Sequence, residues 1–169
     1  QFDSHSDTWD TYFGGFKYTH GTPFRRAIEE NLIDPKKYVI LGLRGGLYDP
    51  DDLKWAIEQG ITIISTDKFY EIGIQETIKI IKDVLADTNI YFTFDIDGID
   101  PTYAPGTGTP EVGGINVREA QMVIRNLRNL NFIGADVVEV SPPFDVNNMT
   151  SLVGATIAFE ILCTMTKTN

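Results

Sequence analysis

The sequence predicts a three-layer α/β/α fold in which a mostly parallel sheet lies between helices. Three observations predict it: strand-like runs alternate with helical periodicities, one of these runs is continuously apolar, and acidic residues stand at the ends of several runs. Helices cover a parallel sheet on both faces, so its strands are continuous apolar runs. In such a sheet, ligands bind at the carboxyl ends of the strands.

The first expected elements are a short strand, a helix and a longer strand. Residues 1–3 resemble the end of a strand, and residues 38–43 form a continuous apolar run. Between them, Thr22 and Pro23 are typical of an N-cap and of the first helical position. They predict a helix that runs to about residue 31.

The middle of the chain repeats this alternation. The acids of residues 49–52 favour the first turn of a helix, because they complement its dipole, and Gly60 favours its end. Residues 61–65 form a β-branched strand. Apolar residues recur at helical spacing over 73–86, and a strand is expected over 90–97.

The last part of the chain adds two helices and a strand. Asn116 and Glu119 have the spacing of a capping box. The helix behind them has one apolar face, formed by Ala120, Val123, Ile124, Leu127 and Leu130. Residues 132–140 are the expected strand. Residues 152–162 are apolar on most sides, which predicts a well-buried last helix.

Composition and charge limit the possible functions. Hydrophobic residues make up 42% and charged residues 22% of the chain, as in ordinary globular proteins. The formal net charge of -10 argues against binding nucleic acid and tolerates a cationic ligand. No apolar run reaches the roughly 18 residues of a membrane helix. A single cysteine, Cys163, favours a reducing compartment, so we expect a cytoplasmic protein.

Two short runs contain residue types that bind metals. Asp3, His5 and Asp7 alternate with other residues in the first run, and Asp95 and Asp97 do so in the second. A strand places alternate side chains on one face, so each run is expected to aim its ligands at one point. Four carboxylates meeting there would resist ionising without cations. The sequence therefore predicts a site for two divalent cations.

The ligand types indicate which ion would bind. Oxygen-rich ligation with one imidazole suits Mn²⁺ better than Zn²⁺. Two such ions can lower the pKa of a shared water enough to supply hydroxide near neutral pH, which predicts a hydrolase. Ca²⁺ is a rival ion, although His is a poor ligand for it. A lone Asp-x-Asp at the end of a strand is also common as a helix or turn cap.

A glycine-rich loop follows the second run. It reads Pro-Gly-Thr-Gly-Thr-Pro over residues 105–110, with Gly113 and Gly114 behind it, and it lacks the Gly-Lys-Ser/Thr of a P-loop. It is either a tight loop or a backbone that approaches metal or substrate, and its place beside Asp97 favours the second interpretation. The aromatic residues of 9–18 either flank a cationic substrate or pack their own loop.

These motifs resemble the ureohydrolase family, which includes arginases and agmatinases. The matching segments are Phe-Asp-Ser-His-Ser-Asp at 2–7, Phe-Asp-Ile-Asp-Gly-Ile-Asp-Pro at 94–101, the glycine-rich loop, and Val-Val-Glu-Val at 137–140. The loop and Thr-His-Gly-Thr-Pro-Phe at 19–24 resemble the agmatinase branch more than the arginases. The resemblance extends over essentially the whole chain and implies an arginase-like fold.

The resemblance also implies metal ligands. They would be Asp3, His5, Asp7, Asp95 and Asp97. Asp3 and Asp95 would bridge two Mn²⁺ ions, with Ni²⁺ as the alternative metal. Asp7 would in addition hydrogen-bond a metal-bridging hydroxide.

Two further residues would act on the substrate. Glu139 would hold the substrate guanidinium, since a carboxylate accepts a forked pair of N–H donors. His20 would bind substrate and pass a proton to the leaving amine, a task that suits an imidazole pKa. Without the resemblance, His20 would be interpreted as a loop histidine, and Glu139 equally well as a structural ion-pair partner.

The implied activity is that of an agmatinase, in which hydroxide attacks the guanidinium carbon of agmatine and releases urea and putrescine. A related guanidino acid or guanidine is an alternative substrate, and a metal-dependent deacetylase is an alternative enzyme. A third alternative is an inactive fragment that acts only in assembly. The expected partners are a small cationic guanidino compound and further copies of the chain, as a trimer or hexamer, with no nucleic acid and no membrane.

Residues 1–169 are expected to form a single, incomplete ureohydrolase domain, its C-terminal portion. The family has an upstream Gly-Gly-Asp-His segment whose His completes the first metal site, whereas this chain contains only His5 and His20. The first strands of the family's sheet are therefore expected to be missing. We expect activity from a full enzyme that contains this sequence.

Overall fold

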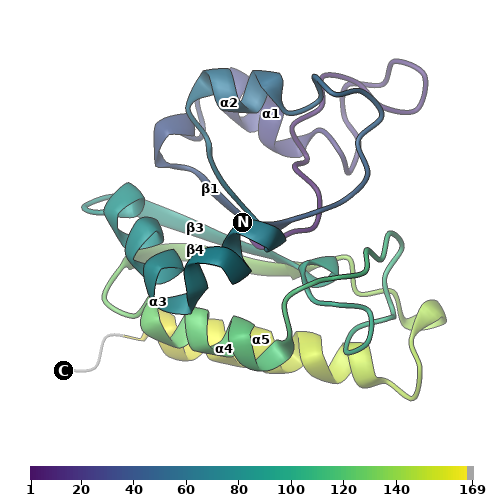
Figure 1. The fold of residues 1–169 in the computed structure, drawn as a ribbon, viewed down its shortest axis with the longest axis vertical. Coiled ribbons are helices and arrows are strands. Elements are labelled where there is room, and N and C mark those ends of the chain that lie inside the picture. The colour runs from purple at the N-terminus through teal and green to yellow at the C-terminus, as the bar shows by residue number, and fades with distance from the viewer. Residues whose placement is uncertain (167–169) are drawn as a thin grey trace.

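A computed structural model describes residues 1–166, and the last three residues of the expected domain lie outside the described residues. Its strands are β1 (Val39–Leu43), β2 (Thr62–Ser65), β3 (Asn89–Asp95) and β4 (Asn131–Val138). β1 pairs with β2 and β3 pairs with β4, both in parallel. The chain start lies between the two pairs and joins them (Figure 1).

Residues 1–3 extend the sheet as a short strand, as the sequence predicts, and the structure places them at its centre. The Phe2 backbone bridges Leu41 on one side and Phe94 on the other, in parallel with both. Its N–H donates to the Thr93 carbonyl at 3.0 Å, and the Asp3 N–H donates to the Leu41 carbonyl at 3.0 Å. The spatial order is therefore β2, β1, residues 1–3, β3, β4, all parallel.

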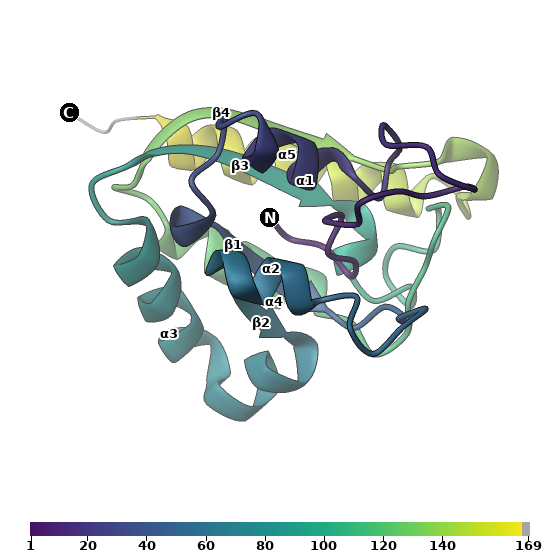
Figure 2. The same ribbon diagram turned by 90° about the horizontal axis from the view of Figure 1, so that it is seen from above.

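Helices cover both faces of this sheet (Figures 1 and 2). Helices α1 (Pro23–Glu29) and α2 (Lys54–Gln59) lie on one face. Helices α3 (Thr66–Leu85), α4 (Val117–Asn126) and α5 (Met149–Met165) lie on the other. Three short 3₁₀ turns complete the described elements: η1 (Pro35–Lys37), η2 (Ile96–Gly98) and η3 (Pro142–Phe144). The predicted three-layer α/β/α fold is confirmed.

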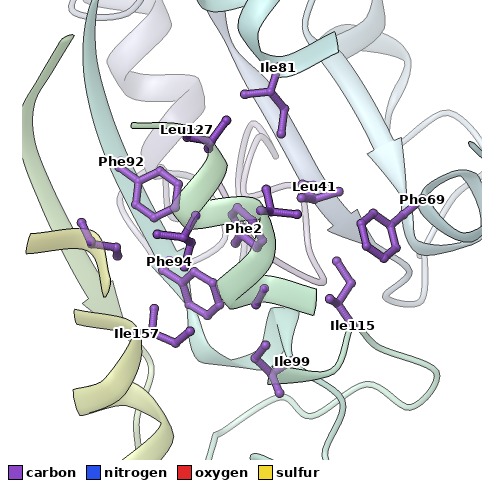
Figure 3. Close-up of a cluster of buried hydrophobic side chains, with 14 of the residues drawn as sticks. Phe2, Leu41, Phe69, Ile81, Phe92, Phe94, Ile99, Ile115, Leu127 and Ile157 are labelled. Carbon is purple, nitrogen blue, oxygen red and sulfur yellow. The ribbon is translucent and has the colours of Figure 1, made fainter. Parts of the chain in front are cut away.

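The core is divided by the sheet into two clusters. The larger cluster gathers the side chains under α3, α4 and α5, with Phe2 at its centre (Figure 3). The Phe2 ring stacks on Phe94, with ring centroids 4.9 Å apart. Ile40 packs instead with α1 and α2 in the smaller cluster. Both faces of the central strands are therefore buried, which is why they read as continuous apolar runs.

Several predicted helix boundaries are confirmed. Asn116 accepts a hydrogen bond from the Glu119 N–H at 2.8 Å, and the Glu119 carboxylate accepts from the Asn116 N–H at 3.0 Å. This reciprocal pair is the predicted capping box. Gly60 ends α2 with a left-handed backbone, φ 90°.

Other boundaries differ from prediction. Helix α2 begins at Lys54 rather than at the acids, because Asp49 and Asp52 accept backbone N–H groups of their own turn. Helix α3 begins at Thr66 and is interrupted at Gly73, whose φ of 77° no helix contains. Thr22 precedes α1 but does not cap it, since its hydroxyl donates to the Lys17 carbonyl at 2.8 Å.

The prediction that the last helix is well buried is wrong. Its inner side chains Val153, Ile157 and Ile161 belong to the core. Its outer face exposes Leu152 by 60%, Phe159 by 64% and Leu162 by 62%. The helix is apolar all round, but only one side of it has a partner among residues 1–166.

None of the helices described by the structure combines the length and the apolarity that crossing a bilayer requires.

Candidate functional site

The predicted site residues gather at the carboxyl edge of the sheet, where the loops after the strands meet (right side of Figure 1). Asp3 follows the central strand, Asp95 ends β3, and Glu139 follows β4. Because parallel strands end at one edge, residues that are far apart in the sequence become neighbours there.

The sequence predicts that each run aims its ligands by alternation along a strand. In the structure a turn after each strand does this instead. The Asp3 carboxylate accepts the His5 N–H at 2.6 Å, and the Asp95 carboxylate accepts the Asp97 N–H at 2.9 Å. Each contact turns the backbone sharply after its strand, as short acidic side chains commonly do. His5 therefore lies in a bend and Asp97 in η2. Two matching turns on adjacent strands bring the runs together.

Three side chains form a compact cluster of metal-ligand type. One ligand atom each of Asp3, His5 and Asp97 lies within 4.8 Å of the others. His5 Nδ1 is 3.1 Å from Asp97 Oδ2 and 3.7 Å from Asp3 Oδ1. Both carboxylates are buried, and the imidazole is half-buried. The convergence of these atoms makes a single point for a cation.

The other predicted residues surround a cavity next to this cluster. The cavity has a volume of about 360 Å³, and its lining includes Asp7, His20, Asp95 and Glu139. Asp95 is 6% exposed at its base. His20 is exposed at the rim, edge-on to the Tyr12 and Phe13 rings with centroids 5.4 Å away in each case. The structure thus brings all seven predicted residues to one region.

Burial and mutual repulsion raise the pKa values of three acids at this site, Asp3, Asp7 and Asp95. Burial, aided by repulsion from Asp3 and Asp97, raises the pKa of Asp95 to about 10. Burial also raises the pKa of Asp7 to about 7 and that of Asp3 well above its ordinary value. For His5, burial opposes the charged form, but the hydrogen bond to Asp97 and the surrounding acids raise its pKa to about 9.

These residues fit a pair of divalent cations. No lysine or arginine among the described residues lines the cavity, so apart from imidazoles the chain supplies no side-chain cation to the acids there. Carboxylates with one imidazole are the donors that Mn²⁺ accepts. A bound dication would reverse the unfavourable crowding, because an opposite charge at short range favours ionised carboxylates.

Two of the cavity residues have a left-handed backbone. Asp7 has a φ of 53° and Glu139 a φ of 63°. Asp tolerates this conformation through local hydrogen bonds, whereas for Glu it costs roughly 1–2 kcal/mol. Such strain concentrates at functional sites, where the surrounding structure imposes it. Glu139 leaves β4 at this point, and its side chain lines the cavity.

Three residues that were not predicted as site residues contact the cluster: Ser4, Thr109 and Glu111. The Ser4 hydroxyl donates to Asp97 Oδ1 at 2.7 Å, and the Thr109 hydroxyl donates to Asp97 Oδ2 at 3.1 Å. Glu111 Oε1 lies 3.6 Å from His5 Nε2. Thr109 belongs to the glycine-rich loop, so its approach follows the expectation that this loop comes close to the site. No pattern in the sequence points to Ser4 or Glu111.

The glycines of this loop have a different use from the one expected. A Cβ on Gly106 would lie 2.8 Å from the Asp145 backbone, and one on Gly114 would lie 2.6 Å from the Asp100 backbone. These glycines let the loop pack closely on other parts of the chain. Thr109, Pro110 and Glu111 are the residues of the loop that line the cavity.

The aromatic loop divides between the two expected uses. Trp9 and Tyr12 line the cavity, with ring centroids 4.9 Å apart. The Tyr12 hydroxyl is 3.0 Å from that of Tyr48 across the rim. Phe16 and Tyr18 are exposed and do not line the cavity.

Comparison with known proteins places this geometry among relatives. The chain is 55% identical over 162 residues to a guanidinopropionase of Pseudomonas aeruginosa. The matched region covers 96% of this chain and 51% of that protein. It is 40% identical over 163 residues to the mitochondrial agmatinase of Gallus gallus, which covers 96% of this chain and 48% of that protein. The chain spans about half the length of the curated relatives it matches.

Solved structures and a family model agree with these matches. The proclavaminate amidino hydrolase from Streptomyces clavuligerus superposes with a TM-score of 0.91 at 40% identity, covering 96% of this chain and 54% of that chain. An arginase from Bacillus subtilis superposes with a TM-score of 0.84 at 28% identity, covering 99% of this chain and 61% of that chain. The model described as "Arginase family" matches residues 1–164. This chain therefore belongs to the arginase family of ureohydrolases, with the arginase-like fold that its sequence predicts.

Proposed function

We propose that this chain is part of a hydrolase that cleaves a small guanidino compound and releases urea, with two Mn²⁺ ions as cofactor. The observation that carries the proposal is the convergence of Asp3, His5 and Asp97 within 4.8 Å, beside a cavity of about 360 Å³ lined by further acids. Buried acids without a lysine or arginine in that lining are suited to cations, either as bound metal or as substrate.

Each predicted ligand has a role toward the metals. The residues that would hold them are Asp3, His5, Asp7, Asp95 and Asp97. Two bound Mn²⁺ ions would supply hydroxide near neutral pH. The Ser4 and Thr109 hydroxyls would hold the Asp97 carboxylate in place, since both already donate to it.

Other side chains would handle the substrate. Glu139 would bind the guanidinium, because its carboxylate faces the cavity and can accept two parallel N–H donors. His20 would pass a proton to the leaving amine from the rim. Asp7, which lines the same cavity, would in addition to its role as a ligand accept a hydrogen bond from the attacking oxygen.

The substrate is a guanidino compound whose second group varies among the relatives. The 55% identity to a guanidinopropionase favours guanidinopropionate over agmatine, since the agmatinases match at 40–42%. We also propose that the protein is cytoplasmic, as its single cysteine favours. It would act as a homo-oligomer, a trimer or hexamer, as the resemblance to the family implies.

A urea-release assay tests the proposal. The complete protein of which this chain is part would be loaded with Mn²⁺ or Ni²⁺ and offered guanidinopropionate, guanidinobutyrate, agmatine, arginine and guanidine. We expect urea from one guanidino acid or from agmatine. Asp97→Asn should lower kcat/KM by more than the roughly 10- to 100-fold that residues behind a metal ligand cause. The control Asp83→Asn changes an exposed acid on α3 and should leave the rate unchanged.

Three results would overturn the proposal. One is the absence of urea from all five compounds with the complete protein folded and loaded with metal. Another is an Asp97→Asn variant that is as active as the control. The third is hydrolysis of acetyl-lysine in place of guanidino compounds, which would make the protein a deacetylase.

A further inference from the structure

Arg44 lies outside the cavity and forms hydrogen bonds with three segments that line it or lie next to it. It follows β1, and its backbone N–H donates to the Ser4 carbonyl at 3.0 Å. Its guanidinium donates to the Asp97 carbonyl at 2.7 Å and to the Glu111 carbonyl at 2.7 Å and 3.1 Å. Three segments that lie far apart in the sequence therefore meet on one residue.

The partners of this guanidinium are all carbonyl oxygens. It also reaches the carbonyls of Gly42 at 3.0 Å, Gly98 at 3.3 Å and Ile99 at 3.3 Å. No carboxylate among residues 1–166 forms an ion pair with Arg44. A guanidinium has five N–H donors in a rigid plane, so it can hold several carbonyls at defined directions, which a lysine cannot do.

Each held segment contains a side chain of the metal cluster. Ser4 lies between Asp3 and His5, Asp97 is itself a candidate ligand, and Glu111 faces His5 Nε2 at 3.6 Å. Arg44 does not line the cavity, so it acts on the walls and not on the substrate. Its contacts set the distance between the two acid runs and the loop of residues 105–114.

The loop is shaped around this contact. A Cβ on Gly114 would lie 2.5 Å from Arg44 Nη2, closer than side-chain atoms approach. Gly114 also donates its N–H to Asp100 at 2.8 Å, which keeps the loop against residues 97–100. The absence of a side chain at residue 114 leaves the space that the guanidinium occupies.

We propose that Arg44 is a positioning residue for the metal centre. Its guanidinium holds the Asp97 turn and the Glu111 loop through their backbone carbonyls, and its own backbone N–H holds the Asp3–His5 turn beside them. This inference rests on the proposed function. Residues behind metal ligands commonly contribute 10- to 100-fold to metal affinity by fixing ligand geometry. Arg44 does so through the main chain, so that ligand side chains stay free to bind.

Mn²⁺ binding tests this proposal independently of turnover. In the complete protein of which this chain is part, Arg44→Met and Arg44→Lys would be compared with wild type by calorimetric titration of Mn²⁺ and by the electron paramagnetic resonance spectrum of the bound ions. We expect Arg44→Met to weaken Mn²⁺ binding by about 10- to 100-fold and to change the spectrum, with circular dichroism unchanged. Arg44→Lys should fall between Arg44→Met and wild type. Arg125→Met, which removes a guanidinium from α4 that contacts Glu160, is the matched control and should bind Mn²⁺ normally.

The outcomes separate this inference from the proposed function. If Asp97→Asn abolishes Mn²⁺ binding but Arg44→Met and Arg44→Lys bind as tightly as wild type, the role of Arg44 is refuted and the metal centre stands. If Asp97→Asn binds Mn²⁺ normally, the proposed function itself fails. Should Arg44→Met not fold, Arg44→Lys decides alone: an unchanged affinity and spectrum would refute the positioning role.

Discussion

At the scale of single residues, the site is built from conformations and contacts that ordinary side chains avoid. Glu139 has a left-handed backbone with a φ of 63°, and its carboxylate lines the cavity. Asp3 and Asp95 are buried acids, and burial together with neighbouring carboxylates raises the pKa of each. Both features cost stability, and both aim a functional group at one point.

Glu139 yields a prediction that separates strain from chemistry. Both Glu139→Gly and Glu139→Ala should lose most activity, because each removes the carboxylate that would bind guanidinium. Glu139→Gly should be the more stable of the two by about 1 kcal/mol, since only Ala retains a Cβ in the left-handed region. Chemical denaturation of both variants measures this difference.

A helical control gives the opposite order. Glu76 is exposed within α3, so Glu76→Gly should be less stable than Glu76→Ala by about 1 kcal/mol. The same order at residues 139 and 76 would show that the left-handed backbone of Glu139 stores no strain.

At the scale of elements, helix α5 is apolar on two sides, but the rest of the described chain covers only one of them. Ile157 is fully buried among the core side chains (Figure 3), whereas Leu162 is 62% exposed. Burial of apolar surface stabilises by about 25 cal/mol per Å², so only the inner side contributes to the stability of the described chain.

Two truncations on α5 test this division. Ile157→Ala should lower the free energy of unfolding by about 2–5 kcal/mol, because it opens a cavity in the core. Leu162→Ala should change it by less than about 0.5 kcal/mol, as surface substitutions do. Urea denaturation followed by circular dichroism compares them. A large loss from Leu162→Ala would mean that the outer face of α5 is covered in solution.

At the scale of the whole molecule, the metal-ligand cluster makes stability depend on pH. The pKa of Asp95 is about 10 and that of His5 about 9, both raised by the fold. Between the ordinary pKa values of these groups, 3.8 and 6.5, and the raised ones, the folded chain keeps protons that the unfolded chain releases. Stability therefore falls as pH rises, until the folded pKa values are passed. Bound cations would remove this dependence by favouring the carboxylates in their charged form.

We therefore predict that the metal-free chain loses stability as pH rises from about 6.5 to about 10. Mn²⁺ at 100 times its Kd, added near pH 8, should raise the free energy of unfolding by about 2.7 kcal/mol. Thermal melts with and without chelator measure both effects. Stability that rises over this pH range, or that ignores Mn²⁺, would contradict the prediction.

The local features of the fold could be predicted from the sequence. The strands at 38–43 and 61–65, the capping box of Asn116 and Glu119, and the closing Gly60 depend on neighbouring residues. The candidate ligands could likewise be predicted, because they lie in two short runs of the sequence. Even the order of layers followed, because apolar strands that alternate with helices have few ways to be covered.

The tertiary structure alone decided which of these pieces meet. Strand pairing set the Asp3 turn beside the Asp97 turn, and the packing around Arg44 brought the Glu111 loop to His5. Tertiary packing also decided which face of α5 is buried and that Glu139 adopts a positive φ. Hydrogen bonds between sequence neighbours can be predicted locally, whereas these contacts depend on burial shared by distant segments. The sequence by itself therefore determined the candidate ligands and most elements of this protein, because these depend on neighbouring residues. The packed sheet decided how they come together in one site.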